Sequence, residues 1–327
     1  MKLNRFTRLA PALIAGALVL TACGGDNNDS ASAADGTTGS GSSSEELAGS
    51  IRVDGSSTVA PLSTAAAEFF AEEQPKVRVT VGTAGTGGGF EKFCAGETDI
   101  SDASRPIDEE EEVPLCAEKG IEYVEIPVAN DALTVVVSTD NDWVDCLTTE
   151  QLKAIWEPKS MVNSWKDVDP SFPDEKLELF GPGTDSGTFD YFTDVINGEE
   201  GASRTDYSPS EDDNVIVQGV SGSKGGLGYF GFTYYEENSD TLKALEVDSG
   251  EGCVAPSSET AQDGTYTPLS RPLFIYASKA AAERPEVAAF LEFYLANDAE
   301  IAEDAQYIPL NEEQKTEAQT AFDSLAG

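Results

Sequence analysis

The stretch "VRVTVGTAGTGGGF", residues 77–90, decides the fold that this sequence predicts. Alternating β-branched residues at 77–81 are typical of a strand, and the glycine-rich segment 82–89 separates them from a helical pattern. A strand, a turn of small residues and a helix in this order form the repeating unit of α/β folds. The same order recurs around 56–61 and 186–189, with serine and threonine in the turns. We therefore interpret 82–89 as a shaped loop and not as a flexible linker.

Short β-rich segments alternate with helical patterns from residue 50 onward, which is typical of an α/β protein with a largely parallel sheet. Thr148 and Gln151 have the spacing of a capping box, so a helix is expected to begin there. We expect further strands at 51–53, 123–128, 132–138, 177–180 and 273–277, and helices at 285–296 and 311–325. A cluster of aromatic residues is predicted to pack in the core and not to stack on a sugar: Tyr229, Phe230, Phe232, Tyr234 and Tyr235.

The first 22 residues have the pattern of a signal peptide. Basic residues precede an apolar run at 9–20, which is too short for a spanning helix because that needs about 20 apolar residues. The tripeptide Leu-Thr-Ala before Cys23 is similar to the lipobox of bacterial lipoproteins, in which the cysteine is lipidated; an ordinary secretory signal with an incidental cysteine is the alternative. Residues 23–48 are mostly small and polar, which predicts a disordered tether.

The composition limits the class of partner. The chain has 327 residues and is 39 % hydrophobic, enough for a sizeable core, and its 20 Lys+Arg against 60 Asp+Glu give a formal net charge of −40. Such a charge repels the phosphates of nucleic acid and excludes nucleic acid as a partner. It does not exclude a small anion, because salt screens distant charges beyond about 8 Å and local donors then decide.

Cysteine and histidine usage bears on disulfides and metals. The sequence has no histidine and no Cys-x-x-Cys pair, so we expect no metal site and no cofactor. Four cysteines follow Cys23, and in an exported chain they predict two disulfides with three possible pairings; buried free thiols are the alternative. These four are Cys94, Cys116, Cys146 and Cys253.

The three turns rich in small residues share a chemistry. A helix N-terminus leaves backbone N–H groups unpaired and carries partial positive charge, so it attracts anions. Glycine lets an oxyanion approach the backbone, and hydroxyls add donors, so three converging turns could surround a tetrahedral anion. Each turn alone is more typical of ordinary helix capping than of an anion site. None has the spacing of a phosphate-binding P-loop, a dinucleotide fingerprint or a nucleophile elbow, and without histidine the hydrolytic triad lacks its base.

Five ordered segments carry a family resemblance. They are "DGSSTVAPL" (54–62), "GTAGTGGGFEKFCAGETDISDASRPI" (82–107), "GPGTDSGTFDYF" (181–192), "GVSGSKGGLGYFGFTYY" (219–235) and "PLSRPLFIYAS" (268–278). Together they resemble the PstS-type phosphate-binding lipoproteins that serve phosphate ABC importers, over essentially all of residues 49–326.

The resemblance implies a two-lobed periplasmic-binding-protein fold of type II. Each lobe would be a mixed sheet flanked by helices, with lobe 1 formed by 49–132 and 268–327 and lobe 2 by 133–267, and the ligand in the cleft between them. The protein would be a monomer without enzymatic activity, held outside the cell membrane by its lipid anchor alone. It would capture inorganic phosphate and deliver it to a membrane permease.

The resemblance also implies the site. Its residues would be Ser57, Thr58, Thr86, Gly87, Ser186, Gly187 and Thr188. The chain departs from the best-known branch of the family in two places, where Ser104 replaces an aspartate and Pro182 an arginine. We expect Ser104 to contribute its hydroxyl and Arg105 to replace the missing cation, with a surface ion pair as the alternative for Arg105.

Phosphate near neutral pH carries a proton that sulfate lacks, so a carboxylate in the site would select phosphate. Asp102 is the candidate acceptor of that proton, with Asp185 as the alternative. Arg271 lies near the return crossing to lobe 1, where we expect a hinge or interlobe salt bridge, with a position in the cleft as the alternative.

The lobe assignment also favours the pairings Cys94 with Cys116 and Cys146 with Cys253, because each pair then lies within one lobe.

Two rival functions stay open at the level of sequence. One is an extracellular phosphatase-like enzyme on the same fold, since metal sites made of aspartate cannot be dismissed by sequence. The other is a receptor for a different oxyanion, such as sulfate, molybdate or a phosphonate.

Overall fold

The computed structural model describes residues 46–326. The signal sequence, Cys23 and the tether up to residue 45 lie outside the described residues, so the predictions made for them are not addressed by the fold. Within 46–326, none of the helices combines the length and the apolar character that crossing a bilayer requires.

The N-terminal part begins with a β-α-β unit, as the opening stretch predicts. β1 pairs in parallel with β2 on one side and with β3 on the other, and α1 buries its apolar face against them. α1 ends at Glu73 with Gln74 as its C-cap, directly before Pro75, because proline cannot continue a helix. The elements are β1 (Gly49–Gly55), α1 (Ala60–Glu73), β2 (Val77–Val81), α2 (Thr86–Cys94), β3 (Ile100–Ala103) and α3 (Glu112–Lys119).

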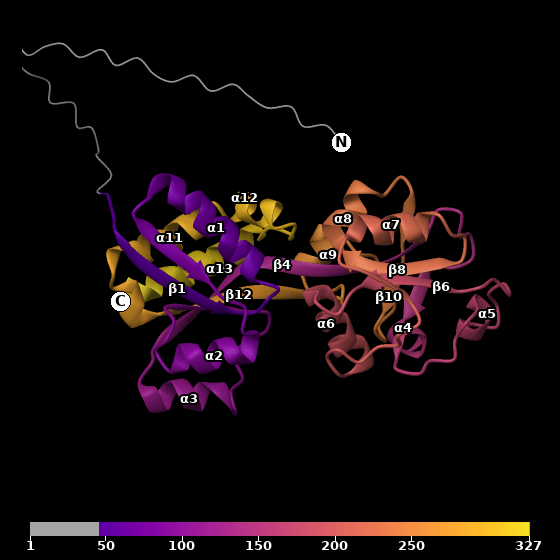
Figure 1. The fold of residues 1–327 in the computed structure, drawn as a ribbon, viewed down its shortest axis with the longest axis horizontal. Coiled ribbons are helices and arrows are strands. Elements are labelled where there is room, and N and C mark those ends of the chain that lie inside the picture. Colours follow the sequence, from indigo (N-terminus) through magenta and orange to yellow (C-terminus); the bar gives the residue numbers. More distant parts are fainter. Residues whose placement is uncertain (1–45, 327) are drawn as a thin grey trace, which may run out of the picture. The chain divides into compact units, whose positions relative to one another are not determined.

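The centre of the fold is a pair of long antiparallel strands, β4 (Tyr123–Ser138) and β12 (Ser270–Ser278), which run side by side in Figure 1. β4 is one continuous strand, so the prediction of two strands at 123–128 and 132–138 was wrong. The intervening residues pair with β12, and Asp131 stands opposite Arg271. Beyond residue 132, β4 turns to pair with β8. One strand therefore belongs to two parts of the sheet.

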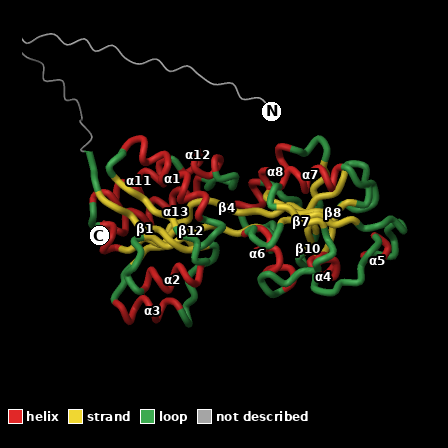
Figure 2. Tube along the Cα trace, viewed as in Figure 1, coloured by secondary structure: helices red, strands yellow, loops and turns green. Residues whose placement is uncertain are grey.

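The sheet is mixed rather than largely parallel, because the two central strands run antiparallel to their neighbours. Its order is β2-β1-β3-β12-β4-β8-β6-β7, with β9 also on β4, and β11-β10-β5 form a second sheet. Figure 2 shows the strands as yellow segments surrounded by red helices. The elements between the central strands are β5 (Cys146–Thr148), α4 (Thr149–Trp156), α5 (Trp165–Val168), β6 (Glu178–Pro182), α6 (Gly187–Phe192), the π-helix Thr193–Asn197, β7 (Ser208–Ser210), α7 (Asp213–Ser221), β8 (Gly226–Gly231), α8 (Phe232–Glu237), β9 (Leu242–Ala244), β10 (Glu246–Asp248), β11 (Cys253–Val254) and α9 (Ser258–Gln262).

The C-terminal elements return to the β1 side of the sheet, where α11 contacts both β1 and α1. They are α10 (Lys279–Ala282), α11 (Pro285–Ala296), α12 (Asp298–Asp304), α13 (Glu312–Asp323) and the short 3-10 helix Ser324–Ala326. The α11 bounds match the predicted helix 285–296. The predicted capping box of α4 is also present, since Thr148 accepts from the Gln151 N–H and Gln151 accepts from that of Thr148.

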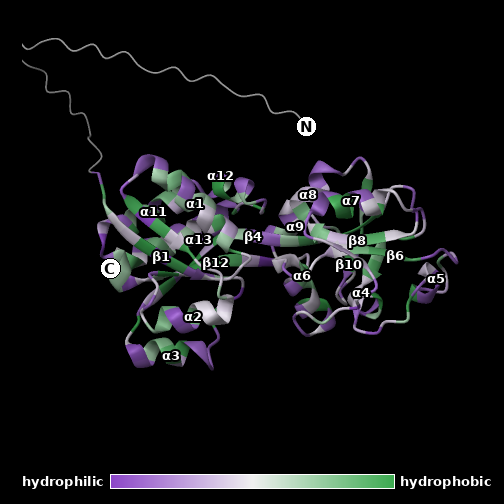
Figure 3. Ribbon diagram, in the orientation of Figure 1, coloured by the Kyte–Doolittle hydropathy of each residue, from purple (hydrophilic) through white to green (hydrophobic). Residues whose placement is uncertain are grey.

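Two large hydrophobic cores meet along β4. The first core contains buried residues from 51–129 and 273–318, and the second contains buried residues from 133–269. Figure 3 shows green, hydrophobic residues concentrated in the strands and purple, hydrophilic residues in most loops. Tyr229, Phe230 and Phe232 are buried as predicted, whereas Tyr234 and Tyr235 are only partly buried.

Both favoured disulfides are confirmed. Cys94 bonds to Cys116 and joins α2 to α3, and Cys146 bonds to Cys253 and joins β5 to β11. Each bond lies on one side of the central strand pair.

Candidate functional site

Turns that precede α1 and α2 meet residues of α6 around one cavity of about 350 Å³, which we call the glycine-loop cavity. Its wall is mainly polar, with hydroxyls, glycine backbone, two arginines and three carboxylates. The lining residues are Ser56, Ser57, Thr58, Ala84, Gly85, Thr86, Gly87, Gly88, Ser104, Arg105, Gly187, Asp190, Tyr191, Asp194, Glu200 and Arg271.

Most site residues expected from the sequence are brought together here. Those that line the cavity are Ser57, Thr58, Thr86, Gly87, Ser104, Arg105 and Gly187. Ser186 and Thr188 do not line it. The Ser186 hydroxyl caps α6 by accepting the Thr188 N–H at 3.2 Å, and Thr188 lines a neighbouring cavity. Ordinary helix capping therefore accounts for the Ser186 contact.

The glycine loop is shaped by one carboxylate. Asp54, at the end of β1, accepts hydrogen bonds from the N–H groups of Gly55 and Ala84, both at 2.9 Å, and pairs with Lys92 of α2. A Cβ at Gly82 would lie 2.6 Å from the Asp54 carboxylate, so a side chain there would displace that carboxylate. The loop is thus folded tightly around Asp54, which our sequence reasoning missed.

The N-terminus of α2 faces this cavity without a capping side chain. Its N-cap, Gly85, has φ 81°, a conformation that favours glycine, and makes no side-chain hydrogen bond. Next to it the hydroxyls of Thr86 and Ser104 lie 3.1 Å apart, and the Ser104 N–H donates to Thr86 at 3.3 Å. Uncapped backbone N–H groups beside two hydroxyls suit an oxyanion.

Gly187 brings the second core close to the first. A Cβ built at Gly187 would lie 2.9 Å from Thr58 Oγ1, which is too close for an unstrained contact. The glycine therefore allows the α6 turn to approach the turn that precedes α1. The sequence indicated this position, although through resemblance and not through the steric reason.

Arg105 forms the ion pair that was the alternative to a ligand role, and it also lies in the cavity wall. It lines the cavity, and its two terminal nitrogens donate to the two carboxylate oxygens of Glu112 at 2.8 Å each. Its side chain is 47 % exposed, and Glu112 is the first cause of a raised pKa for Arg105. Nη1 also donates to the Pro106 carbonyl at 3.0 Å. Much of its donor capacity is therefore already used.

Arg271 also lines the cavity, and it is more deeply set. Its Nε donates to Asp131 at 3.2 Å, its Nη2 donates to Thr58 Oγ1 at 3.2 Å, and its guanidinium lies 3.6 Å from the centre of the Tyr191 ring. Among residues 46–326, no hydrogen bond from Nη1 is found. Asp131 and Arg271 both lie in the segments assigned to lobe 1, so this ion pair is not the interlobe salt bridge that we expected. Within the described residues, Arg271 keeps further N–H donors for the cavity.

Asp102 lies behind the cavity and is not part of its wall. It is fully buried, its Oδ1 accepts from Ser63 at 2.7 Å, and Oδ2 has no partner within the described part of the chain. Burial raises the pKa of Asp102 to about 8, so the group is mostly neutral at pH 7. Its carbonyl oxygen holds the Ser56 N–H at 2.9 Å and thereby fixes the first turn.

The carboxylates that do line the cavity are Asp190, Asp194 and Glu200. Burial, followed by the charge of Glu200, raises the pKa of Asp190, while the Arg271 guanidinium opposes that rise. Asp190 comes three residues after Gly187 in α6, so one helical turn brings it to the same face. That spacing in "SGTFD" is a signal that sequence reasoning overlooked. The alternative candidate, Asp185, is exposed and does not line the cavity.

Within residues 46–326, only Cys146, Glu246 and Cys253 group as three candidate metal ligands. Both thiols of this group are consumed by a disulfide, so it does not form a metal site.

A family model for the PBP superfamily domain matches residues 35–298. The chain belongs to the PBP superfamily. Protein SphX of Synechocystis is 50 % identical over 267 residues, 81 % of this chain and 79 % of the relative. The phosphate-binding protein PstS of Staphylococcus saprophyticus is 41 % identical over 319 residues, 96 % of this chain and 93 % of the relative.

The fold of this chain is also similar to a solved structure. A possible phosphate-binding protein from Planctomyces limnophilus superposes with a TM-score of 0.82 at 48 % identity, covering 86 % of this chain and all of the other. The predicted family and fold class are therefore confirmed.

Proposed function

We propose that this protein is an extracytoplasmic receptor that captures inorganic phosphate and delivers it to an ABC importer in the membrane. The observation that carries the proposal is the glycine-loop cavity, where a fixed guanidinium faces an uncapped helix N-terminus and several hydroxyls. Its relatives include proteins named for phosphate binding. Such a receptor needs no catalytic step, and we propose none.

We propose that the two cores act as the two lobes, with 49–132 and 268–327 in lobe 1 and 133–267 in lobe 2. The cavity is lined by residues of both segments, and β4 and β12 connect the two segments. Closure around the anion would present the loaded form to the permease. Lipidation at Cys23 would hold the monomer at the membrane surface.

Arg271 is the main cation in the proposed site. Its Nη1 is free within the described residues, and the Tyr191 ring fixes the plane of the guanidinium. The hydroxyls and backbone of Ser57, Thr58 and Thr86 would complete one side of the anion shell. Further contacts would come from Gly87, Ser104, Gly187 and Arg105, whose donors are partly used by Glu112. Ser186 and Thr188 would act through the first turn of α6, where the Thr188 N–H donates to the Ser186 hydroxyl.

Asp190 is the proposed acceptor of the phosphate proton, in place of Asp102. Its carboxylate lines the cavity near Arg271 and, among residues 46–326, accepts no hydrogen bond. Protonated phosphate would donate to this oxygen. Sulfate would leave the carboxylate unpaired and face its charge, which disfavours binding.

Isothermal titration calorimetry with phosphate, sulfate and molybdate tests the proposal. We expect one phosphate per chain and a preference over sulfate of at least about 100-fold, since a site that leaves a buried polar group unpaired rejects the wrong ligand strongly. Binding of sulfate or molybdate in preference to phosphate would replace the ligand. A phosphatase assay with added divalent metals separates the receptor from the enzymatic alternative.

A further inference from the structure

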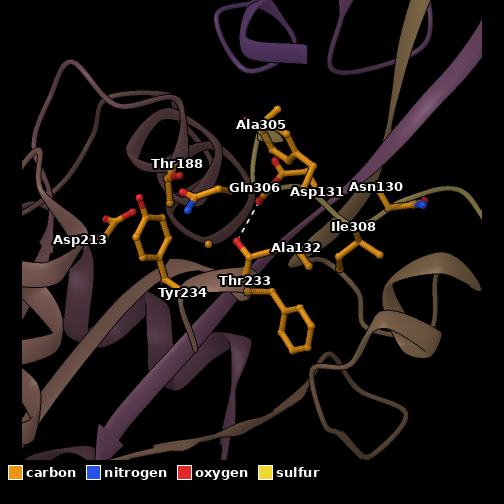
Figure 4. A pocket seen from close by; sticks show the side chains of 13 residues that line it. Asn130, Asp131, Ala132, Thr188, Asp213, Thr233, Tyr234, Ala305, Gln306 and Ile308 are labelled. Carbon is orange, nitrogen blue, oxygen red and sulfur yellow. Dashed lines mark hydrogen bonds between the residues drawn. The ribbon is translucent and has the colours of Figure 1, made fainter. Parts of the chain in front are cut away.

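The Arg271–Asp131 ion pair forms a wall between two cavities. Arg271 lines the glycine-loop cavity, whereas Asp131 lines a second cavity of about 210 Å³, shown in Figure 4. The two residues stand opposite each other in the antiparallel pairing of β12 with β4. Polar side chains around the second cavity include those of Thr188, Asp213, Tyr234 and Gln306.

The Asp131 carboxylate is buried, and only one of its two oxygens accepts a hydrogen bond within the described residues. Its side chain is 8 % exposed, and Oδ2 accepts the Nε–H of Arg271 at 3.2 Å. Oδ1 makes no hydrogen bond in the part of the chain that the structure describes, and the residue lines the second cavity. One oxygen thus orients the guanidinium, and the other is free to be replaced by an amide nitrogen.

Contacts from three directions fix the guanidinium of Arg271. Asp131 holds Nε, the Thr58 hydroxyl accepts from Nη2, and the Tyr191 ring lies beneath the plane. An arginine side chain is otherwise free to adopt many rotamers, and that freedom must be lost when an anion binds. A guanidinium already fixed before binding loses less, so affinity rises.

Resting on the proposed function, we propose that Asp131 is a positioning residue for phosphate binding, because its carboxylate accepts the Nε–H of Arg271 and directs the free Nη1 toward the anion. Its negative charge acts in the opposite direction, since it weakens the attraction between Arg271 and an anion. The hydrogen-bond acceptor and the charge therefore have opposite effects on affinity. Asparagine and alanine separate them.

The test is calorimetric titration of phosphate into the full-length protein and four variants. Asp131→Asn keeps an acceptor for Nε–H and removes the charge, and we expect a Kd within about threefold of the wild type. Asp131→Ala removes both, and we expect a Kd about tenfold higher. Asp213→Asn is the matched control, because it changes a carboxylate of the same cavity that has no hydrogen bond or ion pair with Arg271. We expect no change in its Kd beyond about twofold.

Each other outcome has a definite meaning. Tighter phosphate binding in both Asp131 variants would show that Asp131 acts only as a counter-charge. Equally weaker binding in both would show that the hydrogen-bond acceptor does not determine affinity. Either result overturns the inference. An unchanged Kd in Asp131→Ala overturns it as well. Should the alanine variant fail to fold, Asp131→Ser gives the same comparison, because serine is too short to reach Nε.

The fourth variant, Arg271→Ala, separates this inference from the proposed function. Loss of affinity in Arg271→Ala together with wild-type affinity in Asp131→Ala overturns only the positioning role. No effect of Arg271→Ala overturns the assigned site, and no phosphate binding by the wild-type protein overturns the proposed function itself.

Discussion

Two arginines line the glycine-loop cavity, and their local contacts leave different nitrogens free: within the described residues, both terminal nitrogens of Arg105 are engaged, whereas Nη1 of Arg271 has no partner. Arg105 follows β3 in a loop, is 47 % exposed, and gives both terminal nitrogens to Glu112. Arg271 lies within β12, is 19 % exposed, and gives only Nε to Asp131 and Nη2 to Thr58. The comparison teaches that the donors left over by local pairing, and not the presence of an arginine at a strand end, decide which cation can receive an anion.

The largest expected effect tests this comparison directly. Arg271→Ala should raise the Kd for phosphate about 30-fold, since a charge-assisted hydrogen bond and a fixed positive charge are lost together. Arg105→Ala should raise it by less than about fivefold, because an exposed, already paired cation contributes little. Calorimetry at two salt concentrations gives both values. The comparison fails if Arg105→Ala is the weaker binder.

The next effect concerns the carboxylate beside Arg271. Asp190→Asn should weaken phosphate binding about tenfold and strengthen sulfate binding, because the amide no longer repels an unprotonated oxyanion and can donate to it. Paired titrations with both anions measure the selectivity ratio. An unchanged selectivity ratio would show that Asp190 is not the proton acceptor, and Asp194 and Glu200 would be the remaining carboxylates of the cavity to test.

Much of the fold was predictable because strand alternation and turn composition are local signals. Short sequence patterns predicted the β-α-β unit, the bounds of α11 and the capping box at Thr148. Each of these patterns depends on residues that are close together in the sequence. The continuity of β4 was not predictable, because polar Asn130 and Asp131 look like a loop in sequence. They stay in the strand because β12 pairs with them, and that pairing depends on residues about 140 positions away.

The candidate site was also predictable only in part. Its hydroxyls and glycines lie in short motifs, whereas the partner of each arginine depends on the tertiary fold. Glu112 lies seven positions from Arg105, but Asp131 lies on a different strand from Arg271. The burial of Asp102 likewise depends on α1 and α11 packing over β3, which contribute Ser63 and Tyr294 around it.

The buried Asp102 gives a pH-dependent effect on stability and not on binding. Its pKa is raised from 3.8 to about 8 by burial, so the folded state holds a proton that the unfolded chain releases. The free energy of unfolding should therefore fall as the pH rises from about 4 to about 8, with a slope of up to roughly 1.4 kcal/mol per pH unit from this group. Below and above this window the group has no further effect.

Urea unfolding of Asp102→Asn and wild type across that window measures the difference. The wild type should lose stability relative to the variant as the pH rises toward 8. Parallel curves would show that Asp102 does not hold its proton in the folded protein.

The smallest expected effect on binding comes from the disulfide on the Arg105 side. Cys94 and Cys116 are separated by 22 residues, and removing such a bond costs about 3 kcal/mol of stability in the chain-entropy account. It joins α2 to α3, which carries Glu112, so its loss loosens the Arg105 pair and leaves Arg271 held by β4. A double Cys94→Ala, Cys116→Ala variant should melt at a lower temperature and bind phosphate with a Kd within about twofold of wild type. A large loss of affinity would instead mean that the α2 and α3 side holds the anion as firmly as Arg271 does.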